Sequence, residues 1–195
     1  MACFVVMALM VVVAGAFTPG YSHVTQLISE LGARGSPQEW GVRFAGFLPA
    51  GVFLLAFCGF AYAALPRSLG VALGLLGLAL YATGYVVAAA FPCDLGCRPD
   101  NPSTSQLIHN VGGLLGYLVA PAFMFSLARA ARVWPSAGHL VVAGYAASGL
   151  ALLGLLTLTP TSPVAGLSQR LIEFAVLGWA VLCGRYLAKH GASGA

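Results

Sequence analysis

The chain has 195 residues, of which 59% are hydrophobic and 7% are charged, and its formal net charge is +4. Because about a quarter of the residues in an ordinary soluble domain are charged, this composition excludes a protein that faces water on all sides. Its nine basic residues form no run along the chain, which excludes a nucleic-acid-binding protein that needs a basic patch or stripe. Membrane lipids are therefore the predicted partners, and no nucleic acid is expected.

Six apolar segments of about 20 residues follow one another along the chain, and about 20 apolar residues is the length a helix needs to cross the hydrocarbon layer. They run over residues 2 to 18, 41 to 64, 69 to 91, 105 to 128, 138 to 159 and 169 to 188. We therefore predict an all-α fold, a polytopic membrane protein whose six transmembrane helices form one domain over residues 1 to 195.

The first apolar segment allows two interpretations. It ends in Ala14, Gly15 and Ala16, a pattern that resembles a signal-peptidase site, but no basic residue precedes the segment as a signal peptide requires. We expect it to be retained as a helix. Cleavage stays an alternative, and so does a start codon upstream of Met1.

Residues at the segment boundaries predict where several helices begin. Ser36, Pro37 and Glu39 have the spacing of a capping box with proline at the first helical position, so the second helix is predicted to begin at Pro37. Ser68 and Ser136 are predicted to cap the third and fifth helices.

The charged residues predict an orientation for six spans. With both termini in the cytoplasm, five basic residues lie on the inner side and four on the outer side, which weakly favours this orientation. The inner set is Arg67, Arg129, Arg132, Arg185 and Lys189, and the outer set is Arg34, Arg43, Arg98 and Arg170. All five acidic residues fall on the outer side, and they are Glu30, Glu39, Asp94, Asp100 and Glu173. The outer side is therefore where we expect functional or packing chemistry.

Two cysteines lie in the predicted outer loop, within FPCDLGCRPDNPSTSQLIHN at residues 91 to 110. Cys93 and Cys97 face an oxidising compartment in this orientation, where a disulfide forms and persists. We predict a disulfide that stiffens the loop, with reduced thiols as an alternative. A redox-active or metal role is less favoured, because the spacing is not C-x-x-C and no second Cys/His pair completes a zinc shell. No metal site and no cofactor is expected.

Each outer segment enters the next helix through a Leu-Ile pair and a polar residue, which aligns Ser29, His109 and Glu173. The alignment is either an eroded repeat or chance. Polar residues inside membrane helices normally turn toward the bundle, so a polar pocket is predicted at the outer end. Its members are Ser29, Glu30, Asp94, Gln106, His109, Asn110, Arg170 and Glu173.

Three interpretations of this pocket stay open. Its groups satisfy one another and lock the helix ends in a purely structural protein, or they bind a lipid head group or small amphiphile, or they catalyse a reaction. In the binding interpretation the candidates are Glu30, Gln106, Asn110 and Arg170, although Arg170 can also pair locally with Glu173, three residues away on the same helix.

The enzymatic interpretation is an intramembrane hydrolase. His109 is the candidate general base, oriented by Glu173 or Asp94, and Ser29 or a bound water attacks an ester. A metal variant would use His23, Glu30, Asp94 and His109, but it is not supported, since the sequence has no HExxH motif and no close histidine pair.

Small residues mark helix faces suited to close contact. Gly112, Gly113 and Gly116 share a face with His109, and Gly70 and Gly74 form a similar pair. These faces serve contacts within one chain or between copies, so a homo-oligomer stays an alternative.

Four short motifs in order along the chain resemble a known family. They are ISELGARGSP at residues 28 to 37, FPCD at 91 to 94, IHNVGG at 108 to 113 and GLSQR at 166 to 170. Together they are similar to the bacterial and archaeal membrane family catalogued as domain of unknown function 998. The resemblance covers nearly the whole chain and implies a multi-pass protein of a bacterial inner membrane, without an established activity. The first motif is also similar to the Frag1, DRAM and Sfk1 membrane proteins, which implies a role near lipid or anchor handling.

Overall fold

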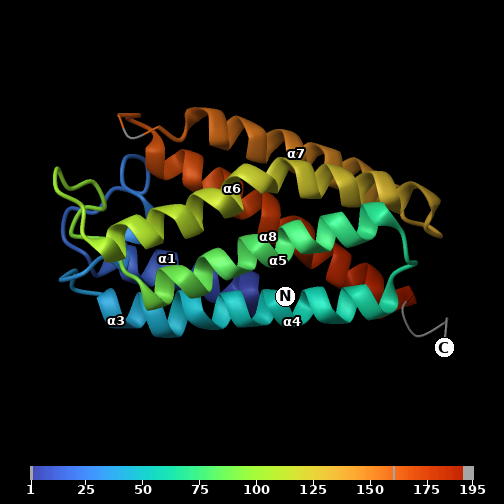
Figure 1. Cartoon of the computed structure of the whole chain (residues 1–195), viewed down its shortest axis with the longest axis horizontal. Helices are drawn as coiled ribbons and strands as arrows, with labels where there is room; N and C mark the ends of the chain where they lie inside the picture. The colour runs from blue at the N-terminus through green and yellow to red at the C-terminus, as the bar shows by residue number, and fades with distance from the viewer. Residues whose placement is uncertain (1, 160, 191–195) are drawn as a thin grey trace.

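The computed structural model describes residues 2–159 and 161–190, and within these ranges every regular element is helical (Figure 1). In chain order the elements are α1 (Ala2–Ala16), α2 (Ile28–Leu31), α3 (Glu39–Gly41), the π-helical segment η1 (Val42–Phe47), α4 (Leu48–Ala64), α5 (Leu69–Ala90), α6 (Thr104–Ala130), the 3-10 turn η2 (Ala131–Val133), α7 (Gly138–Thr157) and α8 (Ala165–His190). The predicted all-α class is confirmed.

Five helices are long and apolar enough to cross a membrane. They are the continuous stretch Glu39–Ala64, α5, the stretch Thr104–Val133, α7 and α8. The protein is therefore a multi-pass membrane protein. Helix α1 has 15 residues, which is about 22 Å of helix against a hydrocarbon layer of about 30 Å. The predicted count of six spans is thus not confirmed.

One of the two predicted serine caps forms. Ser68 precedes α5, and its hydroxyl oxygen accepts a hydrogen bond from the backbone N–H of Val71 at 3.2 Å. Ser136 does not cap α7, because its backbone takes a positive φ of 55° and the helix begins after Ala137, at Gly138. The capping prediction for Ser136 is therefore wrong.

The second predicted helix begins at Glu39 rather than at Pro37. The hydroxyl of Ser36 donates to the carbonyl oxygen of Leu31 at 2.6 Å, so it ties this segment to α2 instead of capping the helix. Glu39 accepts from the backbone N–H of Gly35 at 2.8 Å. The capping box is replaced by a turn that joins α2 to the start of α3.

Helices α5 and α6 approach each other closely through glycine. A methyl group added at Gly84 would lie 2.9 Å from the carbonyl oxygen of Gly112, and one added at Gly116 would lie 3.1 Å from Cα of Tyr81. Residues without a side chain let two helix backbones pack directly against each other. The predicted face of Gly112 and Gly116 thus serves a contact inside this chain, and that contact positions Tyr81.

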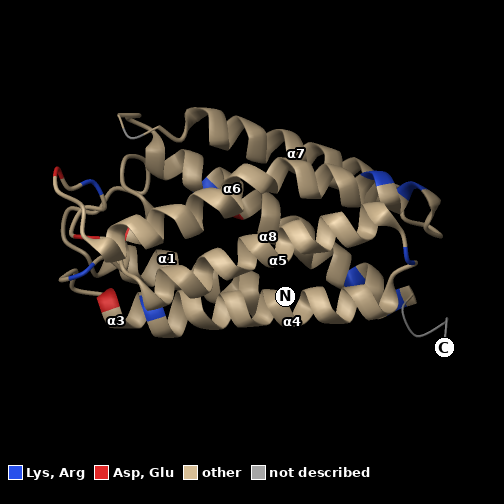
Figure 2. Cartoon of the chain, in the orientation of Figure 1, with Lys and Arg blue, Asp and Glu red and all other residues tan. Residues whose placement is uncertain are grey.

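The two ends of the bundle differ in charge. Figure 2 shows Lys and Arg alone at one end, whereas the other end carries Asp and Glu as well as Arg. The second end comprises the segments around α2, between α5 and α6, and after α7, and we name it the acidic end. Four acidic residues, Glu30, Glu39, Asp94 and Asp100, lie in these segments or directly beside them.

Candidate functional site

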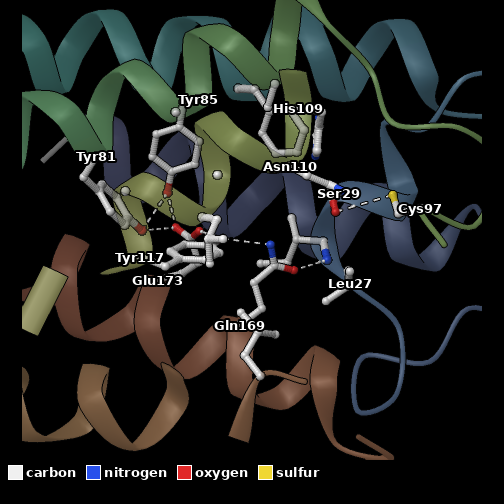
Figure 3. Close-up of a pocket in the computed structure, with 18 of the residues that line it drawn as sticks. Leu27, Ser29, Tyr81, Tyr85, Cys97, His109, Asn110, Tyr117, Gln169 and Glu173 are labelled. Carbon is white, nitrogen blue, oxygen red and sulfur yellow. Dashed lines mark hydrogen bonds between the residues drawn. The ribbon is translucent and has the colours of Figure 1, made fainter. Parts of the chain in front are cut away.

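A cavity of about 420 Å³ lies in the bundle near the acidic end. Its walls come from the α2 segment, η1, α5, α6 and α8 (Figure 3). The loop between α5 and α6 adds Cys97 and Arg98, and the segment after α7 adds Leu158 and Thr159. The walls are apolar over most of their extent. The polar groups that reach the cavity are Ser29, Tyr81, Tyr85, Arg98, His109, Asn110, Tyr117, Thr159, Gln169 and Glu173.

Glu173 lies inside the bundle and receives three tyrosine hydroxyls. Its side chain is 8% exposed. The Tyr81 hydroxyl donates to Oε2 at 2.7 Å, the Tyr117 hydroxyl donates to Oε1 at 2.8 Å, and the Tyr85 hydroxyl also donates to Oε2. Tyr81 and Tyr85 are one turn apart on α5 and so share a face, and Figure 3 shows the three hydroxyls converging on the carboxyl group.

Gln169 connects this carboxyl cluster to α2. Its Oε1 accepts from the backbone N–H of Ile28 at 2.6 Å, and its Nε2 donates to the Tyr117 hydroxyl at 2.8 Å. The backbone N–H can only donate, which fixes the orientation of the amide. Tyr117 accepts from Gln169 and therefore has its own proton free for Glu173. A directed chain of hydrogen bonds thus runs from α2 to the carboxyl group.

His109 also lines the cavity, and its hydrogen-bond partner is a backbone carbonyl. Its Nδ1 lies 2.9 Å from the carbonyl oxygen of Phe91, so Nδ1 must carry a proton. Ser29 contacts the loop instead, with its Oγ 3.5 Å from Sγ of Cys97. Among the residues that the structure describes, no hydrogen bond joins His109 to Ser29, Asp94 or Glu173. The hydrolytic arrangement expected from the sequence is not assembled.

Asp94 and Gln106 do not line the cavity and instead organise the loop before α6. Asp94 accepts from the backbone N–H of Ser103 at 2.9 Å and from its hydroxyl at 2.8 Å, and these hydrogen bonds lower the pKa of the Asp94 carboxyl. Gln106 accepts from the backbone N–H of Asp94 at 2.8 Å and donates to Asn110 at 2.7 Å. Only Asn110 of this group reaches the cavity.

Glu30 and Arg170 likewise hold the chain around α2. Glu30 accepts from the backbone N–H of Leu27 and from the side-chain amide of Gln26, both at 2.9 Å. Arg170 donates to the carbonyl oxygen of Gln26 at 3.1 Å and to the Tyr21 hydroxyl at 2.7 Å. The predicted local pair between Arg170 and Glu173 is therefore wrong, because the guanidinium points to the α2 segment.

Cys93 and Cys97 form the predicted disulfide. Both cysteines are buried and pack with Ala33 and Leu27, and Cys97 also forms part of the cavity wall. The backbone N–H of Arg34 donates to the carbonyl oxygen of Cys93 at 2.8 Å. The disulfide loop and the α2 segment thus form one packed unit over the cavity.

The three tyrosines were not among the candidates that the sequence identified. Tyr81 and Tyr85 share a spacing of four residues, as do Gln169 and Glu173. Paired polar groups at helical spacing in two apolar helices are a usable signal for a buried polar contact. The four residues of the metal variant, in contrast, are not brought together, since no metal-binding group of three His, Cys, Asp or Glu occurs in the part of the chain described.

A family model described as "Protein of unknown function (DUF998)" matches residues 1–186. The chain belongs to the DUF998 family. This confirms the resemblance carried by the four ordered motifs, whereas the similarity to Frag1, DRAM and Sfk1 proteins is not confirmed. All residues that line the cavity fall inside the DUF998 match. No curated protein and no solved structure matches the chain.

Proposed function

We propose that this DUF998 protein binds a lipid-like amphiphile, with the polar head in the cavity and the acyl tail between α6 and α7. The observation that carries the proposal is that the cavity reaches the outer surface of the bundle. Asn110, Leu114 and Thr159 line the cavity and are also exposed, Leu114 by 52%. Because Leu114 lies well inside a membrane-spanning helix, this surface is the one that faces lipid.

The contact between α6 and α7 supports a lateral opening limited to the acidic end. The Ser148 hydroxyl on α7 donates to the carbonyl oxygen of Pro121 on α6 at 2.8 Å. Pro121 lies seven residues beyond Leu114, which is about 10 Å further along the helix. The helices are thus joined deeper in the bundle, whereas the exposed lining residues Asn110 and Leu114 lie nearer the acidic end.

The cavity composition also fits an amphiphile. Ligand sites are mainly apolar with a few convergent polar groups, and here the apolar faces of α5 and α6 surround Glu173, Gln169 and His109. Glu30, Asp94, Gln106 and Arg170, in contrast, act in the fold by holding the loops. We therefore assign these four residues a structural role. The binding role is proposed for the residues that line the cavity.

Filling the cavity tests the proposal. Gly113 lines it, and a methyl group added there meets nothing within 4 Å. We expect Gly113→Leu to fold normally and to lose at least ten-fold of the amphiphile binding that native mass spectrometry detects from lipid nanodiscs. Gly149→Leu is the matched control, because Gly149 on α7 is equally free of contacts but lies outside the cavity. Equal binding by both variants would contradict the proposal.

We also propose a topology for this site. The acidic end faces the exterior of a bacterial inner membrane, α1 belongs to a sixth crossing of one domain, and both termini are cytoplasmic. The support is that Arg67, Arg129, Arg132, Arg185 and Lys189 lie at the opposite end, as cytoplasmic basic residues do.

The topology predicts that a cysteine placed in the loop before α6, as Asp100→Cys, reacts with a membrane-impermeant maleimide on intact spheroplasts. Ser136→Cys, between η2 and α7, is the control for the other side and should react only after lysis. The reverse labelling pattern would invert the proposed orientation.

A further inference from the structure

We propose that the head group taken by the cavity is cationic, a protonated amine or a quaternary ammonium that pairs with Glu173 and lies against the tyrosine rings around it. This inference rests on the proposed amphiphile site and names the class of its ligand. It follows from the three hydroxyls that surround the Glu173 carboxyl group, from the absence of an ion-pair partner for Glu173 among the described residues, and from the aromatic wall.

Three tyrosine hydroxyls donate to the Glu173 carboxyl group, an arrangement that stabilises its charged form. Its two oxygens accept three hydroxyl protons, two on Oε2 and one on Oε1. The proton of Tyr117 is committed to Glu173, because its oxygen already accepts from Gln169. A carboxylate offers about four acceptor positions and no proton of its own. The three tyrosine hydroxyls are neutral donors and leave the negative charge of such a carboxylate uncompensated, so a cation in the cavity can pair with it.

Arg98, from the loop before α6, also lines the cavity, but no side chain in residues 2–159 and 161–190 forms an ion pair with the Glu173 carboxyl group. The ion pair found there joins Arg43 to Glu39, at 2.6 Å and away from the cavity. Arg170 is close in sequence, but its terminal nitrogens donate to Tyr21, to His23 and to backbone carbonyls. A charge buried in a membrane bundle normally has a partner, and Glu173 lines the cavity, from which such a partner can come.

Aromatic rings line the same cavity as Glu173. The ring centroids of Tyr81 and Tyr85 are 5.6 Å apart, those of Tyr81 and Tyr117 are 6.0 Å apart, and those of Phe47 and Tyr85 are 6.2 Å apart. All four side chains line the cavity. Ring faces attract cations, and quaternary ammonium groups are recognised by such aromatic cages. A carboxylate beside several rings favours an ammonium head over a neutral or anionic one.

The test compares three amphiphiles that share a dodecyl chain, each added to the protein in nanodiscs at equal mole fraction and counted by native mass spectrometry. They are dodecyltrimethylammonium, dodecyl maltoside and dodecanoate, which are cationic, neutral and anionic. We expect the wild-type protein to retain the cation at least ten-fold better than the other two. This comparison needs no variant, so it does not depend on how any substitution folds.

Glu173→Gln keeps the shape of the side chain and removes its charge. We expect this variant to lose at least ten-fold of cation binding and to bind dodecyl maltoside as the wild type does, while Gly149→Leu behaves as wild type throughout. Equal retention of all three amphiphiles by the wild type, stronger retention of dodecanoate, or an unchanged preference in Glu173→Gln would overturn the cationic head group. In each of these outcomes loss of binding in Gly113→Leu would still support the amphiphile site, and only unchanged binding there would overturn the site itself.

Discussion

Replacing Gly166 with alanine is expected to separate the α2 segment from α8. Gly166 lies in the first turn of α8, and a methyl group there would overlap the carbonyl oxygen of Gln26 and lie 2.9 Å from its backbone nitrogen and carbonyl carbon. Backbone atoms cannot rotate away as a side chain can, so the segment itself must shift. Overpacking in well-packed sites costs about 1–3 kcal/mol and sometimes more, which should lower the midpoint of thermal unfolding in detergent by several degrees.

The same displacement should reach the cavity. The backbone N–H of Leu167 donates to the carbonyl oxygen of Val24 at 3.0 Å, and Arg170 donates to Gln26, so several contacts depend on this approach. Gly178→Ala on the same helix is the control, because a methyl group there meets nothing within 4 Å. If both variants unfold at the same temperature and bind amphiphile equally, the contact between Gly166 and Gln26 does not hold the segment in place.

Replacing Tyr117 with phenylalanine is expected to break the chain of hydrogen bonds between α2 and Glu173. The hydroxyl accepts from Gln169 and donates to Glu173, so its removal leaves one buried donor and one acceptor position unsatisfied. Each unsatisfied buried group costs about 1–3 kcal/mol, and more when it is charged. The unfolding midpoint should fall, and hydrogen exchange at the Ile28 amide should rise, because its acceptor Gln169 is no longer held.

Tyr62→Phe is the matched control for this substitution. Tyr62 on α4 is 56% exposed, and its hydroxyl makes no hydrogen bond to the described part of the chain. It should therefore change neither the unfolding midpoint nor the exchange at Ile28. Unchanged exchange in Tyr117→Phe would mean that the Ile28 amide is held independently of the Glu173 cluster.

Much of the fold was predictable because it depends on local composition. An apolar run of about 20 residues indicates a membrane helix whatever its neighbours are, which is why five of the predicted segments appear as spanning helices. The cap at Ser68 and the disulfide between Cys93 and Cys97 were predictable for the same reason, since each joins residues at most four positions apart.

The site was predictable only in part, because its contacts join distant segments. Glu173 bonds to hydroxyls 56, 88 and 92 residues away, and no local rule identifies such partners. Local rules even misled at Arg170, where the three-residue spacing to Glu173 indicated a pair. The guanidinium instead contacts Tyr21 and Gln26, 149 and 144 residues earlier, because the chain before α2 packs against the first turn of α8.

The proposed opening between α6 and α7 has a consequence for how occupancy of the cavity depends on the membrane. A guest that arrives sideways, through Asn110 and Leu114, comes from the surrounding leaflet and not from bulk water. The concentration that sets its binding is then its mole fraction in the membrane. Diluting the buffer would leave the occupancy of the cavity unchanged, whereas adding lipid that does not bind would lower it. Two membranes in contact with the same aqueous solution but with different lipid compositions would therefore leave different fractions of this protein occupied.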